Sequence, residues 1–566
     1  RVKDLVELAL RIEGCARHTS VHAAGVVISP RPLHELVPVA LSGKDELTSQ
    51  YPMNDLEKVG MLKMDFLGLT TLTVIADCLG SIKEKLGITI DWTKIPNNEE
   101  KTMQLFGEGR TEAIFQFESS GMAEMCRRLK PKELEDLSAL NALYRPGPLD
   151  GGMIDDFIDR HRGIKPVEYI VPEMKDILGN TFGVLVYQEQ IMQLAQKLAG
   201  YSLGEADLMR RAMGKKKIEE MAVHEEKFVG GAVGNGIARK TAKEIFDLMA
   251  KFADYGFNRS HSMAYAVLAF QTAYLKAHYP AHFYAAVLSH EAQDSAKVYK
   301  YSTELRSMGL ALLPPDINES DEGFTPGDAA VRYGLTAIKG MGTSGVQAIV
   351  EARSAGKFTS LFDFFAQIGP SVVNRRGLES LIAAGAFDSL MPGGKTIAEW
   401  RAQLSAAIEP ALSHGQRMAE DKLRGQSALF GVETAGEVAD EELPTVEPWS
   451  KAELARNEKA AIGFYLSTHP LDNYKDLLED LGIANFADNS DLRAGDTVTM
   501  GGIISTLAVR QSKKGNRFCM FRLEDRSGGI KAIAWGEAFQ KFAALLKDDE
   551  MVIVEGRIEA SEGQDP

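Results

Sequence analysis

The densest group of chemically active side chains in this 566-residue sequence is a basic run between positions 210 and 217. The chain as a whole is acidic, with a formal net charge of −15. An acidic protein gains little from non-specific attraction to nucleic acid, so a local basic cluster points to a defined phosphate-binding place. The alternative is a solvated helix end, where basic side chains complement the helix dipole. The basic residues are Arg210, Arg211, Lys215, Lys216 and Lys217.

A capping box predicts how this cluster is held. Ser202 and Glu205 have the spacing at which a serine and a glutamate satisfy the first backbone N–H groups of a helix. Gly214 suits the end of that helix, because glycine readily adopts the left-handed backbone found after a last turn. We therefore expect Arg210 and Arg211 in the last turn of this helix.

Lys63 and Asp65 form a second candidate group. They lie in the apolar run Met61–Leu69, which is predicted to contain a strand. Because side chains two positions apart on a strand face the same way, this spacing places a cation beside a carboxylate. Phosphoryl transfer uses such groups: carboxylates bind two magnesium ions and a basic group balances the phosphate charge. An ordinary ion pair has the same spacing, so the pattern alone leaves both interpretations open.

The segment Asn258, Arg259, Ser260 and His261 precedes a helix that is expected to begin near Ser262. Hydroxyl, imidazole and backbone N–H groups gathered at a helix N-terminus form a favourable site for an anion. The alternative is an ordinary capped helix, with Ser260 or Ser262 as the N-cap.

Two glycine-containing segments are predicted to form turns. In the run Tyr144–Pro148 proline fixes the backbone and Gly147 supplies a special conformation, while Arg145 could contact phosphate. Gly340 and Gly342 separate helical segments, as in a helix-hairpin-helix, whose backbone amides bind a DNA phosphate without reading the base sequence. A plain corner between two helices is the alternative for the second segment.

The composition is that of an ordinary globular protein, with 45% hydrophobic and 25% charged residues, and the length allows roughly three or four domains. Cys15, Cys78, Cys126 and Cys519 lie far apart, which argues against a disulfide framework and a thiolate zinc site and suits a reducing cytosol. We therefore expect a cytoplasmic protein. The longest apolar stretch, residues 263–288, is interrupted by polar residues, so no membrane span is predicted.

Hydrophobic periodicity predicts a multidomain α+β protein. Residues 1–70 mix helix and strand, residues 71–325 are mostly helical, and residues 326–470 form a smaller helical domain. From about residue 495 to 566 the pattern changes to strands, which predicts a small β barrel of the oligonucleotide-binding (OB) type that lacks its end. Residues 431–448 are acidic without a basic residue and are expected to form a solvated linker.

The predicted barrel has a surface suited to single-stranded DNA. Phe518 and Phe521 offer rings on which bases could stack, and basic residues next to them could hold the backbone. A purely structural barrel is the alternative. The basic residues are Arg510, Lys513, Lys514 and Arg517.

Five motifs together make the sequence closely resemble the alpha subunit of bacterial DNA polymerase III, a family C replicative polymerase. They follow the family's order from one end of the chain to the other. The motifs are GMLKMDFLGL at 60–69, YRPGPL at 144–149, VYQEQ at 186–190, LMRRAMGKKK at 208–217 and NRSHSMAYA at 258–266.

The resemblance implies a domain for each part of the chain. Residues 1–70 would be the end of the thumb and the C-terminal part of the palm, and residues 71–325 the fingers. Residues 326–470 would form the helix-hairpin-helix and clamp-binding domain, and residues 495–566 a truncated OB fold.

The resemblance also implies DNA-templated DNA synthesis, in which two Mg²⁺ ions assist nucleotidyl transfer from a dNTP to the 3′ hydroxyl of a primer. Asp65 would be a catalytic metal ligand and Lys63 its catalytic neighbour. The family's other two carboxylates lie on an Asp-x-Asp strand that nothing in this sequence matches. We therefore interpret the chain as a C-terminal fragment of about two-thirds, cut at both ends and inactive alone.

Other site residues follow from the same resemblance. The fingers would bind the nucleotide through Arg210, Arg211, Asn258, Arg259, Ser260 and His261. DNA would be bound by Lys215, Lys216, Lys217, Gly340, Gly342, Arg510, Lys513, Lys514 and Arg517. The implied partners are primer–template DNA, single-stranded template, dNTP, a sliding clamp, a clamp loader and a proofreading exonuclease.

The pentapeptide Gln426, Ser427, Ala428, Leu429 and Phe430 resembles the short clamp-binding peptide of bacterial polymerases. An exposed segment of this kind places two apolar side chains in a pocket of the clamp while its glutamine hydrogen-bonds at the rim. Two alternatives remain open for the whole protein: an error-prone alpha paralogue and a non-catalytic DNA-binding scaffold.

Overall fold

The computed structural model describes residues 2–15, 21–22, 24–42, 45–214, 218–253, 255–369, 371–424, 442–467, 469–483, 486, 495–512, 515–525 and 528–559. The predicted clamp peptide, residues 426–430, and the lysines at 215–217, 513 and 514 lie outside these ranges. The chain divides into two compact units, Arg1–Thr70 and Thr71–Pro566.

The first unit has the mixed α+β structure expected for it. Strands β1 and β4 pair antiparallel, as do β2 and β3. Its small core contains Val37, Leu56 and Met61. The elements are α1 (Val2–Ile12), β1 (Gly25–Ile28), η1 (Leu33–Glu35), β2 (Val39–Leu41), β3 (Leu47–Ser49), α2 (Met53–Leu56), η2 (Glu57–Val59) and β4 (Leu62–Asp65).

The second unit begins with a long helical region, as predicted. Among the described residues no helix is both long and apolar enough to cross a membrane. The elements are α3 (Thr70–Leu86), η3 (Trp92–Lys94), α4 (Glu100–Gly107), α5 (Ser120–Leu129), α6 (Leu134–Leu143), α7 (Pro146–Asp150), α8 (Met153–His161), η4 (Pro172–Met174), α9 (Lys175–Leu178), η5 (Gly179–Thr181), α10 (Gln188–Ala199), α11 (Leu203–Gly214), α12 (Ile218–Gly234), α13 (Arg239–Ala253), α14 (Arg259–His278), α15 (Pro280–His290) and α16 (Ser295–Ser307).

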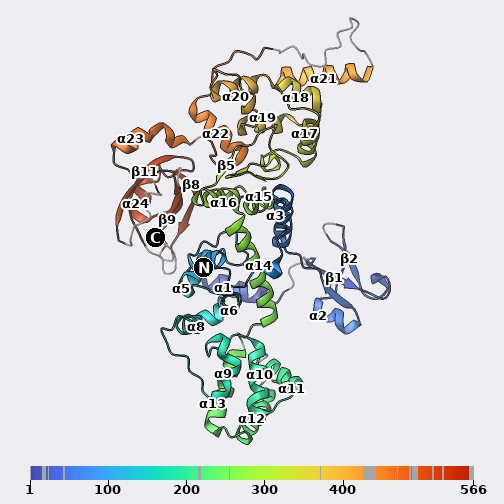
Figure 1. Ribbon diagram of the computed structural model, residues 1–566, viewed down its shortest axis with the longest axis vertical. Coiled ribbons are helices and arrows are strands. Elements are labelled where there is room, and N and C mark those ends of the chain that lie inside the picture. Colours follow the sequence, from blue (N-terminus) through green and yellow to red (C-terminus); the bar gives the residue numbers. More distant parts are fainter. Residues whose placement is uncertain are drawn as a thin grey trace. The chain divides into compact units, whose positions relative to one another are not determined.

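Two hydrophobic cores organise most of these helices, while α3, α15 and α16 belong to a further core. Helices α10 to α13 pack around one core, to which Leu194, Met209 and Phe246 belong, and they lie together with α9 in Figure 1. Helices α4, α5, α6 and α8 and most of α14 pack around the other core. The N-terminus of α10 therefore lies where these two helix groups meet, because Val186 and Tyr187 just before it belong to the second core.

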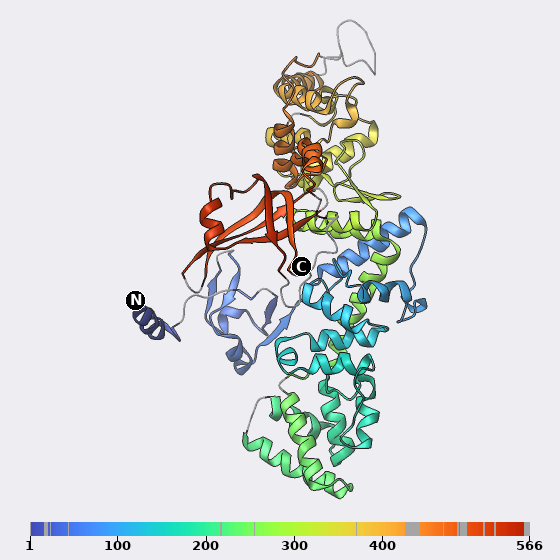
Figure 2. The same ribbon diagram turned by 90° about the vertical axis from the view of Figure 1, so that its left-hand side faces the viewer.

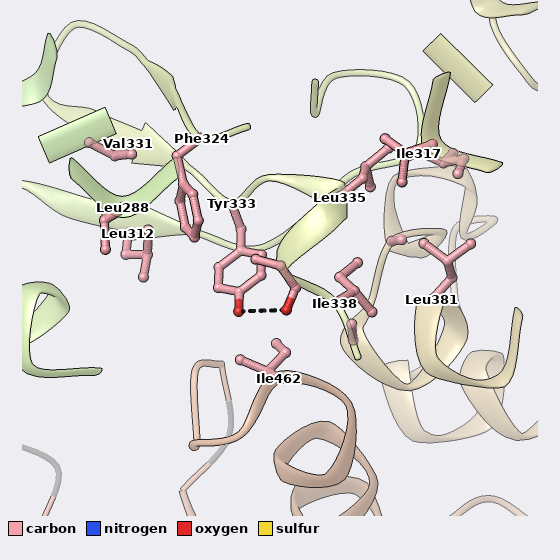
Figure 3. Close-up of a cluster of buried hydrophobic side chains, with 14 of the residues drawn as sticks. Leu288, Leu312, Ile317, Phe324, Val331, Tyr333, Leu335, Ile338, Leu381 and Ile462 are labelled. Atoms are coloured by element: carbon pink, nitrogen blue, oxygen red, sulfur yellow. Dashed lines mark hydrogen bonds between the residues drawn. The ribbon is translucent and has the colours of Figure 1, made fainter. Parts of the chain in front are cut away.

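A three-stranded sheet and a group of helices follow. The sheet has the order β5-β7-β6, and its core continues into the helices, so that Tyr333 and Ile338 lie between Leu312 of the sheet and Leu381 of α19 (Figure 3). The elements are β5 (Ala311–Leu313), β6 (Thr325–Pro326), β7 (Ala330–Arg332), η6 (Leu335–Ala337), α17 (Thr343–Ala355), α18 (Leu361–Ile368), α19 (Arg375–Ala384), η7 (Asp388–Leu390), α20 (Ile397–Ala406), α21 (Ile408–Arg424) and α22 (Lys451–Ile462).

The described part of the predicted acidic linker, residues 442–448, is not the solvated segment that was expected. Leu443 packs against the core of the helical domain, as does Trp449 just beyond it. The backbone N–H of Trp449 also donates to the carbonyl of Ala398 at 3.3 Å. Burial of these apolar side chains holds this segment to the domain despite its acidic composition.

The last part of the chain forms the predicted OB-type sheet. Its strands have the order β10-β9-β8-β11 and lie together as one curved sheet, coloured red in Figure 2. Alternation along β9 buries Cys519, Phe521 and Leu523 on one face. The elements are η8 (Pro470–Tyr474), α23 (Lys475–Asp480), β8 (Thr497–Gln511), β9 (Arg517–Glu524), β10 (Gly529–Ala534), α24 (Gly536–Phe542) and β11 (Met551–Arg557).

Candidate functional site

Lys63 and Asp65 form an ion pair on β4. Nζ of Lys63 lies 2.6 Å from a carboxylate oxygen of Asp65. The hydrogen bond from Lys63 is the largest cause that lowers the pKa of Asp65 below its usual value, so this carboxylate is ionised at neutral pH. Its side chain is 44% exposed, which leaves it accessible to a ligand.

The opposite strand makes room for this pair at Gly25, which is in register with Asp65. A Cβ atom at Gly25 would lie 2.8 Å from Cε of Lys63 and 2.9 Å from Nδ1 of His22. Nδ1 of His22 accepts hydrogen bonds from the backbone N–H groups of Ala24 and Gly25 at 3.1 and 2.6 Å, and so shapes the turn into β1. A side chain at position 25 would therefore displace Lys63 or His22.

Asp65 offers the oxygen donor that a hard cation such as Mg²⁺ prefers. Within the described ranges, no group of three or more His, Cys, Asp or Glu side chains could hold a metal ion. A pair of Mg²⁺ ions needs several oxygen ligands, so the described residues fit only part of such a site.

The expected capping box is present at the start of α11. The backbone N–H of Ser202 donates to Glu205 at 3.0 Å, and the backbone N–H of Glu205 donates to the Ser202 hydroxyl at 3.4 Å. Helix α11 extends to Gly214 and has Arg211 in its last turn. The expectation that Arg210 also lies in the last turn is wrong, because Gly214 continues the helix and does not adopt the expected positive φ after it.

Arg210 and Arg211 share the carboxylate of Asp207. Nη2 of Arg210 lies 2.8 Å from Oδ1 of Asp207, and Nε of Arg211 lies 2.9 Å from Oδ2. The hydrogen bond from Arg210 is the largest cause that lowers the pKa of Asp207. Both guanidinium groups are therefore anchored on one side of α11. The group formed by Arg210, Arg211 and Asp207 has a net charge of +1. Sequence reasoning missed Asp207, although its i, i+3 and i, i+4 spacing to the arginines is a readable signal.

Gln188, the first residue of α10, joins α11 to the segment before α14. Its Oε1 accepts a hydrogen bond from Nη1 of Arg210 at 3.3 Å, and its Nε2 donates to the carbonyl of Gly256 at 3.0 Å. The backbone N–H of Gln188 donates to the carbonyl of Phe257 at 2.9 Å. No sequence pattern identifies this role, because the three partners are far apart in the chain.

The start of α14 differs from the expectation. The helix begins at Arg259, and its N-cap is Asn258, whose Oδ1 accepts from the backbone N–H of His261 at 2.8 Å. Ser262 is instead buried inside the helix and donates to the carbonyl of Ser138 at 2.6 Å. The expected helix start near Ser262, with Ser260 or Ser262 as N-cap, is therefore wrong, because Asn258 is an equally good cap and comes earlier.

A carboxylate already lies at this helix N-terminus. Oε2 of Glu189 accepts from the backbone N–H of Arg259 at 3.0 Å, and its Oε1 accepts from Nδ2 of Asn258 at 2.9 Å. Glu189 thus takes the place that sequence reasoning gave to a bound anion at these backbone N–H groups. The side chains of Arg259 and His261 remain as the groups that can meet a ligand there.

Arg259 and His261 lie among aromatic rings. The guanidinium of Arg259 lies 5.6 Å from the ring centroid of Tyr187. The ring of His261 packs between those of Phe257 and Tyr265, at centroid distances of 5.5 and 4.3 Å. Burial raises the pKa of Tyr187 to about 12, so its hydroxyl stays neutral.

The turn at Tyr144–Pro148 packs against the same region. Nη2 of Arg145 donates to the carbonyl of Tyr255, and its guanidinium lies 4.5 Å from the ring centroid of Phe257. The expected special backbone conformation of Gly147 is wrong, since Gly147 lies in the short helix α7 and is not among the glycines with positive φ. Glycine is needed there because a Cβ atom would lie 2.2 Å from the ring of Tyr255.

Four separate motifs thus meet around the N-terminus of α10. Arg145, Arg210 and Arg259 contact the segments 186–189 or 255–258, which are themselves joined by backbone hydrogen bonds. Lys63 and Asp65 belong to the other compact unit.

The predicted helix-hairpin-helix turn begins at Gly340, whose φ of +88° lies in the left-handed region that favours glycine. Gly342 is the N-cap of α17, which spans Thr343–Ala355. Helix α19 packs on this turn, since a Cβ atom at Gly377 would lie 3.3 Å from the carbonyl of Gly340.

One of the two expected stacking rings on the OB-type sheet is not accessible. Phe521 is only 5% exposed and belongs to the core, so its expected role as a stacking surface is wrong. The ring of Phe518 instead lies 4.8 Å from that of Trp535, which is 51% exposed and was missed in the sequence. Arg510 is in register with Phe518, so a basic and an aromatic side chain are neighbours on the sheet.

Four family models match successive parts of the chain. The chain matches "Bacterial DNA polymerase III alpha NTPase domain" at residues 1–68 and "Bacterial DNA polymerase III alpha subunit finger domain" at residues 71–236. It also matches "Helix-hairpin-helix motif" at residues 309–396 and "OB-fold nucleic acid binding domain" at residues 498–566. The four matches follow one another without overlap.

Individual proteins are similar over almost the whole chain. The DNA polymerase III subunit alpha of Thermus aquaticus is 41% identical over 573 residues, that of Aquifex aeolicus 40% over 560 residues, and that of Escherichia coli 40% over 572 residues. These alignments cover 98–99% of this chain but only 46–49% of each relative. The chain thus spans just under half the length of these relatives, so the expected share of about two-thirds was too high.

Proposed function

Because the chain belongs to the bacterial DNA polymerase III alpha subunits, we propose that it is part of a DNA polymerase that transfers nucleotides from dNTPs to the 3′ hydroxyl of a primer. The contacts of Arg145, Arg210 and Arg259 with the joined segments 186–189 and 255–258 support this proposal most directly. Asp207 balances only part of their positive charge, so the three guanidinium groups suit a ligand with several negative charges.

In this proposal Arg210 and Arg211 neutralise the triphosphate of the incoming nucleotide. Asp207 fixes both guanidinium groups through Nε and Nη atoms, so they approach a phosphate with little loss of side-chain freedom. Asn258, Arg259, Ser260 and His261 form the neighbouring part of the nucleotide site. Glu189 keeps the anion away from the backbone of α14 and directs it to the side chains.

Asp65 would be one ligand of the two Mg²⁺ ions in the complete subunit. Bound metal ions would polarise the reacting phosphate and lower the pKa of the primer hydroxyl. Lys63 keeps the carboxylate of Asp65 ionised and brings a positive charge to the same face of β4. The described residues show no complete group of metal ligands around Asp65, so two ions would need further oxygen ligands.

The remaining domains would hold DNA and partner proteins in the cytoplasm. The turn at Gly340 and Gly342 would bind phosphates of the duplex, and Arg510 and Arg517 with the barrel's aromatic rings would hold the single-stranded template. Residues 426–430 would bind a sliding clamp. Replacing Leu429 and Phe430 by Ala should weaken clamp binding at least about tenfold without changing clamp-free extension. Unchanged clamp affinity would contradict this role.

Steady-state primer extension by the complete subunit tests the proposal. Arg210→Ala and Arg211→Ala should each raise the KM for dNTP about tenfold or more and leave DNA affinity nearly unchanged, because each loses a charge-assisted bond to phosphate. Arg239→Ala, which removes an exposed arginine of α13, is the matched control and should change neither value. Loss of DNA affinity at unchanged KM would instead assign Arg210 and Arg211 to the DNA channel.

A further inference from the structure

We propose that Gln188 is a positioning residue that holds the guanidinium of Arg210 at a fixed place relative to the start of α14. The inference rests on the proposed nucleotide role of Arg210. Gln188 would not touch the nucleotide itself, and it would act through Arg210.

The two hydrogen bonds of the Gln188 side chain carry this inference. Arg210 can only donate and the carbonyl of Gly256 can only accept, so Oε1 must face Arg210 and Nε2 must face Gly256. Both ends of the amide are thereby used, and its orientation is fixed. The amide is a direct bridge between α11 and the segment that leads into α14.

The backbone of Gln188 is fixed as well. Its N–H donates to the carbonyl of Phe257, and the N–H of Phe257 donates to the carbonyl of Val186 at 3.3 Å. Gly256 permits this close approach, because a Cβ atom there would lie 3.0 Å from Cγ of Gln188. The side chain therefore starts from a backbone that is tied to the start of α14.

Arg210 needs this second partner because Asp207 holds only one side of its guanidinium. Asp207 accepts from Nε and Nη2 of Arg210, at 3.1 and 2.8 Å, and Gln188 accepts from Nη1. Asp207 is on the same helix, so it cannot fix Arg210 relative to α14. Gln188 is on another helix and supplies that restraint, and the side chain of Arg210 is still 23% exposed.

Glu189, the next residue of α10, holds the start of α14 itself. Its carboxylate holds Asn258 and the first backbone N–H of α14, at 2.9 and 3.0 Å. Two successive residues of α10 thus hold two parts of the proposed triphosphate site, and their spacing sets the distance between these parts.

A double-mutant cycle in the complete subunit tests the proposal. Gln188→Met keeps the side-chain volume and removes both hydrogen bonds, so it should raise the KM for dNTP about three- to tenfold with kcat changed less than about twofold. In the Arg210→Ala background the same change should raise KM no further, because Gln188 then has no guanidinium to hold. Gln193→Met, at an exposed glutamine of the same helix, is the matched control.

The outcomes separate the inference from the proposed function. A rise in KM for Arg210→Ala but none for Gln188→Met or Gln188→Ala would overturn the inference alone. Additive effects of Gln188→Met and Arg210→Ala would also overturn it, since they would mean that Gln188 acts independently. An unchanged KM for Arg210→Ala would overturn the nucleotide role of Arg210 and the inference with it. Melting temperatures of all variants report whether a change in KM reflects lost folding.

Discussion

The ring of Tyr255 occupies the space that a side chain at Gly147 would need. A Cβ atom at Gly147 would lie 2.2 Å from two carbon atoms of that ring. Real Cβ atoms do not approach so closely, so the ring or the α7 backbone would have to move. This contact ties the turn before α7 to the segment 255–258, through which Arg145 and Gln188 are also held.

Gly147→Ala should therefore destabilise this part of the fingers by about 1–3 kcal/mol, as expected for an overpacked contact. The variant should melt at a lower temperature and show a raised KM for dNTP, because the segment 255–258 shifts. Gly80→Ala is the control: Gly80 lies in α3 with nothing within 4 Å of an added Cβ atom, and alanine there should be neutral or stabilising. Equal melting temperatures for the two variants would contradict the packing argument.

Elements with a strong periodic pattern could be predicted from the sequence. Helix α6 (Leu134–Leu143) lies in the region expected to be helical, and β11 (Met551–Arg557) lies in the region expected to form strands. In β11 exposure alternates along the strand, whereas α6 is buried on nearly all sides, so its apolar composition favours a core helix. The four-stranded sheet and the large helical region were also expected from the pattern of apolar residues.

The errors had two kinds of cause. The role of Gly147 is decided by Tyr255, far along the chain, whereas the start of α14 was misplaced because the local cap Asn258 precedes Ser260 and Ser262. The error at Phe521 also had a local cause. Residues three apart on a strand face opposite sides, so Phe518 and Phe521 cannot both lie on the surface, and strict use of the period would have shown this.

A pH dependence is expected from His282, which is buried on α15 with its Nδ1 2.9 Å from the hydroxyl of Ser81 on α3. Burial, with a smaller contribution from Lys85, lowers the pKa of His282 below its ordinary value of 6.5. The unfolded chain binds a proton at this residue as the pH falls below about 6.5, whereas the folded chain binds it only at a lower pH. Stability should therefore decrease as the pH falls from 7.5 to 5.5.

His282→Gln should make this decrease smaller, because glutamine takes up no proton in either state. The measurement is the difference between the melting temperatures at pH 7.5 and 5.5, compared between the unsubstituted protein and the variant. Comparing differences removes any constant cost of the substitution itself. Equal differences in both proteins would show that His282 does not contribute to the pH dependence.

Asp65→Ala in the complete subunit should abolish nucleotide addition and leave the melting temperature unchanged, because the side chain is partly exposed and its main partner is Lys63. Asp55→Ala is a closely matched control. Asp55 is 46% exposed and pairs with Lys58 at 2.7 Å, and its loss should not affect synthesis. Near-normal primer extension by the Asp65 variant would contradict the metal-ligand role.

The OB-type sheet offers a test in which two phenylalanines of one strand should behave differently. Phe518 and Trp535 lie with their ring centroids 4.8 Å apart beside Arg510, whereas Phe521 belongs to the core. A base can stack on an exposed ring, and such a contact contributes about 1–3 kcal/mol to binding of single-stranded DNA. Phe518→Ala and Trp535→Ala should thus weaken single-strand affinity by about fivefold or more, with the melting temperature nearly unchanged.

Phe521→Ala should have the opposite pattern. It removes a buried ring, which costs about 3–5 kcal/mol, so the barrel should melt at a markedly lower temperature. Single-strand affinity measured well below that temperature should be nearly normal, because the ring does not reach the surface. Single-strand binding by fluorescence anisotropy and thermal melting on the three variants separate the two roles. If Phe518→Ala and Trp535→Ala bind single strands normally, the barrel is structural at this face, and Arg510 and Arg517 must serve another surface.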